Sequence, residues 1–298
     1  MEYIPAKSII TRTKDSAWFG IDYNMNIYRG CSHGCIYCDS RSDCYHNEQF
    51  DKIKVKSDAL TIIRNDLRRK VKKGVVGTGA MSDPYNPIER EMKLSRNALE
   101  LINAYGFGAS IATKSPLVTR DADILRDIKA HSPVLVKITI TTCDDSLSKL
   151  IEPNAAPSSQ RFEAVKALSS EGLFTGILLM PVLPFIEDNL ENITSLIRIA
   201  KEHGARFIYP AFGMTMRQGQ REYYYQALDK HFPGLKEKYI RRYGSRYTCS
   251  SPNAKALWSV FASQCDSQGI LYKMQDIIRS YKMGYGSSQL SLIPDEVE

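Results

Sequence analysis

The amino-acid sequence lacks a segment that could cross a lipid bilayer. Its most apolar stretch, residues 173–186, contains two prolines and is shorter than the roughly 18 residues that a membrane-spanning helix needs. The N-terminus also lacks the basic region and apolar core of a signal peptide. A composition with 18 Gly, 13 Pro and 43% hydrophobic residues excludes collagen-like, disordered and coiled-coil chains. We therefore predict a soluble, cytoplasmic protein without a membrane partner.

The seven cysteines do not suggest a disulfide framework, because their number is odd and the chain is long. Three of them lie in one short segment, Cys31-Ser-His-Gly-Cys35-Ile-Tyr-Cys38, with the spacing C-x3-C-x2-C. Three thiolates on a tight loop predict a metal centre, and Gly34 gives the backbone the freedom that such a loop needs. The spacing alone leaves two kinds of centre open. Structural zinc needs a fourth ligand, such as Cys44, His33 or His46, whereas a 4Fe–4S cluster with three cysteines keeps one iron open.

Strand-like and helix-like segments alternate along most of the chain. The predicted strands are 25–28, 75–79, 108–113, 134–142, 173–180 and 206–212. The predicted helices between them are 58–73, 95–105, 120–131, 158–171 and 189–203. Such alternation indicates parallel strands joined by helical crossovers. We therefore predict the α/β fold class, as a partial (β/α)6 TIM-type barrel with a C-terminal helical extension.

Five of the predicted strands are followed by residues with reactive or polar side chains. The cysteine loop follows the first strand, and the next four are followed by Ser82-Asp83, Lys114, residues 141–143 and Met180-Pro181. In parallel barrels the reactive groups gather at the carboxyl ends of the strands. We therefore expect these positions to meet at one mouth of the barrel.

The cysteine segment reads C-x3-C-x-aromatic-C, with Tyr37 as the aromatic residue, and resembles the signature of the radical S-adenosylmethionine (SAM) enzymes. Within that superfamily the chain is similar to the spore photoproduct lyase family. The similar pieces occur in the same order: Tyr28-Arg-Gly-Cys31, Ser82-Asp83, Thr113-Lys114, Lys137-Ile-Thr139, Glu152-Pro153, Arg161 and Met180-Pro181.

The resemblance implies a 4Fe–4S cluster held by Cys31, Cys35 and Cys38, with SAM bound at the open iron. It implies reductive cleavage of SAM to a 5′-deoxyadenosyl radical that abstracts hydrogen from a substrate. An electron donor such as flavodoxin or ferredoxin is implied as a partner. Lys114 would pair with the SAM carboxylate, and Ser82 would bind its methionine or ribose portion. The other cofactor-binding residues implied are Tyr37, Asp83, Met180 and Thr139, which takes the place of a family serine although threonine is also ordinary strand composition.

The sequence departs from the family pattern at two positions. The hydrogen-donor cysteine of the lyase corresponds to Ala80, and the tyrosine after its third cluster cysteine corresponds to Asp39. Alanine cannot return a hydrogen atom, so the same repair of thymine dimers by the same relay is not expected. Cys143 is a candidate replacement donor because it follows the fourth predicted strand; alternatively it packs in the core, as single cysteines commonly do. We expect the remaining cysteines, Cys44, Cys249 and Cys265, to be buried structural residues.

Residues 214–256 carry nine Lys/Arg against three Asp/Glu and so supply most of the net charge of +7. Tyrosines are interleaved at positions 223, 224, 225, 239, 243 and 247. Cations neutralise phosphates and aromatic faces stack on unpaired bases, so the segment predicts binding of DNA or another nucleic acid. The alternative is a solvated helical face whose tyrosines pack in the core.

We predict four regions: an N-terminal extension (1–24), the radical SAM core barrel (25–213), a basic, tyrosine-rich and mainly helical extension (214–284) and a flexible tail (285–298). The tail contains Gln289-Leu-Ser-Leu-Ile293. This segment resembles the short peptide by which bacterial replication and repair proteins dock on the DNA sliding clamp. The alternative is that the tail packs on its own barrel.

These observations predict a radical SAM enzyme that abstracts hydrogen from a substrate, most plausibly a lesion in DNA or another nucleic acid. One alternative is a radical SAM maturase or an enzyme that modifies a small molecule. An alternative from another class is a non-catalytic nucleic-acid-binding protein that contains zinc.

Overall fold

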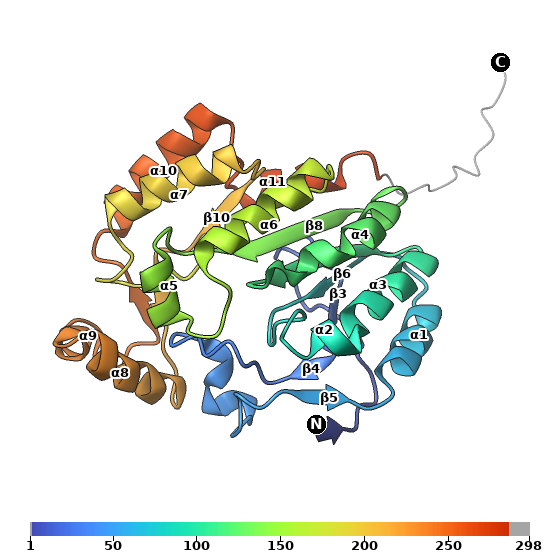
Figure 1. The fold of residues 1–298 in the computed structure, drawn as a ribbon, viewed down its shortest axis with the longest axis horizontal. Coiled ribbons are helices and arrows are strands. Elements are labelled where there is room, and N and C mark those ends of the chain that lie inside the picture. Colours follow the sequence, from blue (N-terminus) through green and yellow to red (C-terminus); the bar gives the residue numbers. More distant parts are fainter. Residues whose placement is uncertain (1, 286–298) are drawn as a thin grey trace, which may run out of the picture.

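The computed structural model describes residues 2–285 and places a seven-stranded sheet at the centre of the molecule (Figure 1). In spatial order its strands are β10 (Ile208–Pro210), β9 (Thr175–Leu179), β8 (Val134–Thr139), β7 (Gly108–Thr113), β6 (Val75–Thr78), β3 (Tyr23–Met25) and β2 (Ile10–Arg12). The strands from β3 to β10 in this sheet run parallel, and β2 pairs antiparallel with β3 at the edge. The predicted α/β fold class with a parallel sheet is confirmed.

Helices that follow the strands cover the outer face of the sheet (Figure 1). These are α1 (Ala59–Arg69), α3 (Leu94–Ala104), α4 (Ala122–Lys129), α6 (Ser158–Ser170) and α7 (Leu190–Glu202). Side chains such as Ile63, Leu125 and Leu196 are fully buried against the sheet. Short elements lie between them: α2 (Glu89–Met92), α5 (Asp145–Ile151) and the 3-10 segments η1 (Asp39–Arg41), η2 (Asp43–Tyr45) and η3 (Pro116–Asp121).

The first predicted strand, 25–28, is wrong, because the chain changes sheets there. β3 ends at Met25, and β4 (Tyr28–Arg29) belongs to a second, three-stranded sheet with β5 (Lys54–Lys56) and β1 (Glu2–Ile4). The carbonyl of Ile27 accepts the backbone N–H of Lys56 at 3.1 Å, which turns the chain toward β5. The cysteine loop therefore starts from this small sheet and not from the central one.

The fourth predicted strand ends earlier than expected, because its last carbonyls accept hydrogen bonds from side chains. β8 ends at Thr139, whose carbonyl accepts a hydrogen bond from Arg161 at 2.9 Å. The carbonyl of Thr141 accepts one from the Asn192 amide, also at 2.9 Å. Ile140 still donates its backbone N–H to the Leu178 carbonyl of β9 at 3.1 Å. Residues 141–143 then turn toward α7, where Asn192 contacts Thr141 and Cys143.

The C-terminal extension supplies a short antiparallel ribbon and four helices. The elements are β11 (Gly213–Thr215), α8 (Gln220–His231), α9 (Leu235–Tyr243), β12 (Thr248–Ser250), α10 (Ala254–Gln268) and α11 (Met274–Lys282). Helix α10 packs beside α7 (Figure 1). On α11, Ile277 and Tyr281 pack against Phe19 inside the barrel, and the Tyr281 hydroxyl donates to the Phe19 carbonyl at 2.7 Å. This helix thus closes the amino-terminal end of the barrel.

The division of the chain into four regions stays a prediction. The tail with its clamp-like segment, Gln289–Ile293, lies outside the described residues. Among residues 2–285, no helix has the length and apolar character of a membrane span.

One lysine lies inside the barrel without a carboxylate partner. Lys137 on β8 is 2% exposed, and its ammonium donates to the Ser110 hydroxyl of β7 and lies 4.9 Å from the centre of the Phe19 ring. None of the ion pairs formed within residues 2–285 includes it. Burial lowers the pKa of Lys137 to about 7, because the charged form loses its hydration there.

This burial predicts a pH dependence of stability that belongs to Lys137. Between pH 7 and the ordinary lysine pKa, the unfolded chain holds a proton that the folded chain releases, so the free energy of unfolding rises with pH. One proton corresponds to a slope of at most about 1.4 kcal/mol per pH unit. Lys137→Met should lose this slope, as measured by urea unfolding between about pH 7 and 9. The exposed Lys149→Met is the control, and equal slopes in wild type and Lys137→Met would contradict the assignment.

Candidate active site

The loop that carries the three clustered cysteines follows β4 directly and rests on the segment after α5. The backbone N–H of Ile36 donates to the carbonyl of Ile151 at 2.9 Å. Gly34 has φ +69°, and a Cβ at this position would approach Pro153 Cγ to 3.1 Å. Only glycine adopts this left-handed turn readily so close to a neighbouring loop. The cysteines are therefore carried by a preformed loop.

The three thiols form a donor set that fits an iron–sulfur cluster. Cys35 is buried, and Cys31 and Cys38 are half-buried; no cysteine of the chain is in a disulfide. Burial and the nearby carboxylate of Asp83 raise the pKa of Cys31 to about 11, and burial also raises the pKa of Cys35. The loop alone thus favours protonated thiols, and a bound metal centre supplies the charge that holds thiolates. Sulfur donors are the ligands that iron–sulfur clusters use.

Two of the three side chains considered as a fourth zinc ligand contact other residues. Cys44 is exposed and accepts a hydrogen bond from Arg217 Nη1 at 3.3 Å. His33 is buried, and its Nδ1 lies 3.5 Å from a carboxylate oxygen of Asp83. His46 is exposed. In the part of the chain that the structure describes, no three His, Cys, Asp or Glu side chains are placed to hold a single metal ion.

Asp83 joins two strand ends next to the cysteine loop. One carboxylate oxygen accepts the Thr113 hydroxyl at 2.6 Å, and the other accepts the backbone N–H of Lys114 at 2.8 Å. Beside it, the Ser82 hydroxyl donates to the carbonyl of Gly30 at 2.7 Å, directly before Cys31. The predicted site residues Ser82 and Asp83 thus tie the ends of β6 and β7 to the base of the cysteine loop.

Glu152 lies at the centre of a buried group of charges beneath the cysteine loop. Its carboxylate pairs with Arg161 at 2.5 Å, accepts the Tyr37 hydroxyl and lies 3.9 Å from the Lys114 ammonium. The Lys114 ammonium also lies 5.5 Å from the centre of the Tyr37 ring. The predicted residues Tyr37 and Lys114 are therefore brought together, by a carboxylate from another part of the chain.

The electrostatics of this group leave one positive charge facing the thiols. Burial opposes ionisation of Glu152, but Arg161 and Lys114 outweigh it and hold its pKa below the ordinary value. Burial opposes the charge on Lys114 too, yet Cys35 and Glu152 raise the pKa of Lys114. One carboxylate between two cations has a net charge of +1. This charge suits an anionic ligand or a thiolate-bound cluster.

The other predicted site residues fall on different sides of the barrel wall. Thr139 is 7% exposed at the carboxyl end of β8, and Met180 lines a cavity at the mouth. Cys143 instead packs against the core between sheet and outer helices, and its backbone N–H donates to Asn192 of α7. The structure thus does not bring Cys143 to the mouth, because the chain turns toward α7 after Ile140.

A cavity of about 530 Å³ opens at the mouth beside the cysteine loop. Tyr37, Cys38 and Ala80 line it from the barrel, together with Met180. The ribbon of β11 and β12 lines the opposite side, through residues such as Thr248. Sequence reasoning missed this ribbon, because neither three-residue strand has a recognisable alternation pattern.

The tyrosines of the basic extension divide into core and surface residues. Tyr224 and Tyr239 are fully buried and Tyr243 is 5% exposed, so base stacking by these three is excluded and the core-packing alternative is confirmed for them. The Tyr224 hydroxyl donates to that of Tyr239, which donates to the Pro184 carbonyl at 2.7 Å. Tyr247 is 47% exposed. The buried tyrosines therefore anchor the extension beside the loop that follows β9.

The remaining cysteines differ in their exposure to solvent. Cys249 and Cys265 are buried, as predicted. The prediction that Cys44 is buried is wrong, because its loop folds outward and the guanidinium of Arg217 covers it only from one side.

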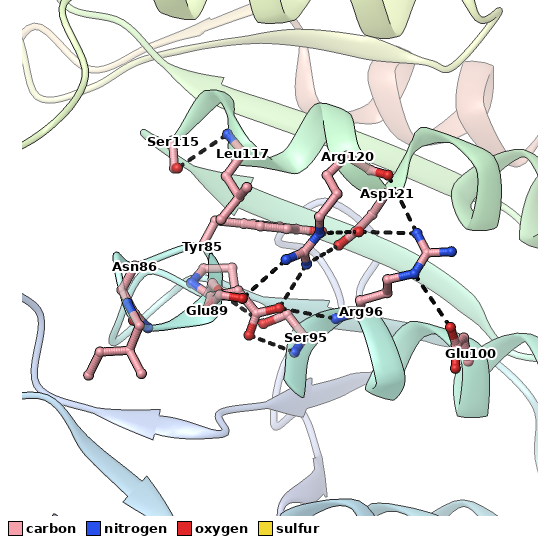
Figure 2. A network of polar contacts seen from close by, with 12 residues as sticks. Tyr85, Asn86, Glu89, Ser95, Arg96, Glu100, Ser115, Leu117, Arg120 and Asp121 are labelled. Carbon is pink, nitrogen blue, oxygen red and sulfur yellow. Dashed lines mark hydrogen bonds and ion pairs between the residues drawn. The ribbon is translucent and has the colours of Figure 1, made fainter. Parts of the chain in front are cut away.

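Figure 2 shows a second polar network, which is centred on Glu89. Glu89 is fully buried, pairs with Arg120 at 2.8 Å and accepts the backbone N–H of Ser95 at 2.9 Å. Arg120 also pairs with Asp121 at 2.7 Å, and Arg96 reaches the same carboxylate at 3.3 Å. The network thus joins α2, the start of α3 and η3.

Two contacts connect this network to the loops of the site. The Tyr28 hydroxyl donates to Glu89 at 2.5 Å, just before the cysteine loop. The Ser95 hydroxyl donates to the carbonyl of Pro84 at 2.6 Å, next to Asp83. Sequence reasoning missed this network and gave no role to Glu152 or Arg161. Their only signal was membership of the motif pieces that resemble the lyase family.

The charge group beneath the cysteine loop predicts a large stability effect. Glu152→Gln leaves the buried guanidinium of Arg161 without its anion, so we expect a loss of about 3–5 kcal/mol in urea unfolding. Glu163→Gln is the matched control, because Glu163 is mostly exposed and, within residues 2–285, pairs only with His203; its loss should stay below about 1 kcal/mol. Adding Arg161→Met to Glu152→Gln should restore part of the loss. Equal effects of the two single variants would contradict the role of Glu152.

Comparison with known proteins places this site in a family. The family model described as "Radical SAM superfamily" matches residues 25–205. An uncharacterized protein of Methanocaldococcus jannaschii is 35% identical over 188 residues, which cover 62% of this chain and 68% of that protein. An uncharacterized protein of Mycobacterium tuberculosis is 28% identical over 244 residues, covering 80% of this chain and 72% of that protein.

Solved structures with the same fold include spore photoproduct lyase. Its complex with dinucleoside spore photoproduct has a TM-score of 0.63 at 15% identity, covering 90% of this chain and 80% of that one. A variant with bound AdoMet and dinucleoside spore photoproduct also has a TM-score of 0.63, at 16% identity, covering 89% and 79%. At these identities the likeness shows the fold alone. The chain belongs to the radical SAM superfamily, and is thereby a radical SAM enzyme with a 4Fe–4S cluster and SAM as cofactors.

Proposed function

We propose that this enzyme abstracts hydrogen from a nucleic-acid substrate, a lesion in DNA or in another polynucleotide. The observation that carries the proposal is the cavity of about 530 Å³ beside Cys38, covered by a ribbon from the basic extension. Small-molecule pockets commonly measure about 300–1,000 Å³, so one nucleoside has a suitable size. The excess of Lys/Arg in residues 214–256 favours a polyanion. A nucleotide of a duplex would have to turn out of the stack to enter.

In this proposal Cys31, Cys35 and Cys38 hold the cluster through their thiolates. When bound, the cluster would supply the electron that reductive cleavage of SAM needs, and hydrogen abstraction from the substrate would follow. The protein confines this chemistry through the depth of the cysteine loop, in which Cys35 is buried.

Lys114 binds the SAM carboxylate in this proposal. The carboxylate of Glu152 is already paired with Arg161 at 2.5 Å, while the Lys114 ammonium lies farther away, at 3.9 Å. Lys114 therefore keeps hydrogen-bond donors for a ligand, since an ammonium has three. Glu152 and Arg161 act as positioning residues for it.

The other predicted cofactor-binding residues take complementary places. Ser82 would bind the methionine or ribose portion of SAM, and Asp83 and Tyr37 would complete the cofactor site beside the cysteine loop. Thr139, at the carboxyl end of β8, would bind near the nucleoside of SAM, and Met180 forms part of the cavity wall. Cys143 has no part in the proposed reaction, because it packs on the outer side of the sheet.

The sliding clamp, through Gln289–Ile293, and an electron donor such as flavodoxin or ferredoxin stay predicted partners. The cytoplasmic location and a role in DNA repair stay predictions as well. A maturase or small-molecule enzyme would give a different result in the experiment below.

Turnover on oligonucleotides tests the proposed substrate class. The reconstituted wild-type enzyme, with SAM and a reductant under anaerobic conditions, is given ultraviolet-irradiated DNA, the same DNA without irradiation, or none. We expect irradiated DNA to accelerate formation of 5′-deoxyadenosine and to yield an altered nucleoside, both measured by mass spectrometry. A maturase or small-molecule enzyme would form 5′-deoxyadenosine at the same rate in all three, and that result would contradict the proposal.

A further inference from the structure

The cations of the basic extension fall into two groups. Some are fixed by protein partners: Arg217 donates to the Tyr247 hydroxyl at 3.0 Å, and Lys236 pairs with Asp229 at 2.6 Å. Three others, Arg241, Arg242 and Arg246, are exposed, and within residues 2–285 their side chains form no hydrogen bond or ion pair. These three guanidinium groups are therefore free to bind an anion.

The three arginines share one hollow of about 500 Å³ between α9 and β12. Its other polar residues include Thr248 and Ser250, which offer hydroxyl groups. One carboxylate, that of Asp188, contacts a lining residue of the hollow. It accepts hydrogen bonds from the Ser251 hydroxyl at 2.6 Å and from the backbone N–H of Phe185 at 2.5 Å. Because Asp188 is engaged by these internal donors, the lining of the hollow itself stays cationic.

The backbone around the hollow is fixed in advance. Arg221 donates to the carbonyls of Gly244, Ser245 and Arg246 at 2.8, 3.2 and 2.7 Å. The Tyr243 hydroxyl donates to the carbonyl of Ser250 at 2.6 Å, which ties α9 to β12. The turn that presents Arg246 is therefore ordered before any ligand arrives, which lowers the entropic cost of binding.

The hollow adjoins the cavity at the barrel mouth. Thr248 and Ser250 line both, so a single strand, β12, separates the arginines from the proposed substrate cavity. Guanidinium groups match the paired oxygens of a phosphate better than ammonium groups do, and all three cations here are arginines.

Resting on the proposed function, we infer that this arginine hollow binds a backbone phosphate of a single-stranded polynucleotide whose neighbouring nucleoside occupies the mouth cavity. The phosphate places the strand, and the cavity receives the nucleoside that reacts. Because the contact is to the backbone, it is independent of base sequence and shared by DNA and RNA.

The test compares two triple variants that remove the same charge. Arg241→Ala/Arg242→Ala/Arg246→Ala empties the hollow, and Arg64→Ala/Arg68→Ala/Arg69→Ala removes three exposed arginines of α1. Binding of a fluorescent single-stranded DNA and an RNA of the same sequence is measured by anisotropy at several salt concentrations. The hollow variant should bind both about tenfold or more weakly. Its slope of log affinity against log salt should fall by about 0.7, the value expected for one lost phosphate contact on a single strand.

A methylphosphonate oligonucleotide, which lacks backbone charge, completes the test. The wild type should prefer the phosphodiester strand strongly, and the hollow variant should largely lose that preference. Cluster absorbance and the urea midpoint check that each variant is folded. Equal losses in the two triple variants would overturn the inference while leaving the proposed function standing. A wild type that binds no polynucleotide would overturn both.

Discussion

The buried carboxylate of Glu152 is the contact on which the site depends, since it holds together segments that are distant in the sequence. Its partners are Arg161 on α6, Lys114 after β7 and Tyr37 between the second and third clustered cysteines. The Tyr37 contact joins residues 115 positions apart. An anion buried among these groups is stable only while its partners stay, so the cysteine loop and the barrel wall are fixed as one unit.

A similar constraint acts from the outer side of the barrel. Glu89 accepts a hydrogen bond from the Tyr28 hydroxyl, just before the cysteine loop. It also forms an ion pair with Arg120, in the segment that follows Lys114. Glu89 thus contacts the chain before the cysteine loop and Glu152 contacts it within that loop, while Asp83 joins the ends of β6 and β7. This arrangement leaves Cys38 at the wall of the mouth cavity and the Lys114 ammonium beside the cysteine loop. The C-terminal extension then covers that mouth with the β11–β12 ribbon, anchored by its buried tyrosines.

The sequence alone predicted the features that local residue patterns encode. The spacing of Cys31, Cys35 and Cys38 identified the cysteine loop, and the alternation of segments predicted the parallel sheet. It missed features that depend on distant contacts. The pairing of Glu152 with Arg161 has no local sequence pattern, and the end of β3 at Met25 depends on contacts with β5. Cys143 faces outward because Arg161 and Asn192 donate hydrogen bonds to the carbonyls at the end of β8. Interleaved tyrosines look alike in sequence whether they stack on bases or pack in a core.

The most direct test of the central claim compares two cysteine variants from the same segment. Cys35 lies in the cluster loop, whereas Cys44 is exposed and contacts Arg217. After anaerobic reconstitution, iron and sulfide content and reductive SAM cleavage are measured together. Cys35→Ala should lose the cluster and form no 5′-deoxyadenosine, while Cys44→Ala should match the wild type in both. An intact cluster with SAM cleavage in Cys35→Ala, or a wild type that binds only zinc, would contradict the account.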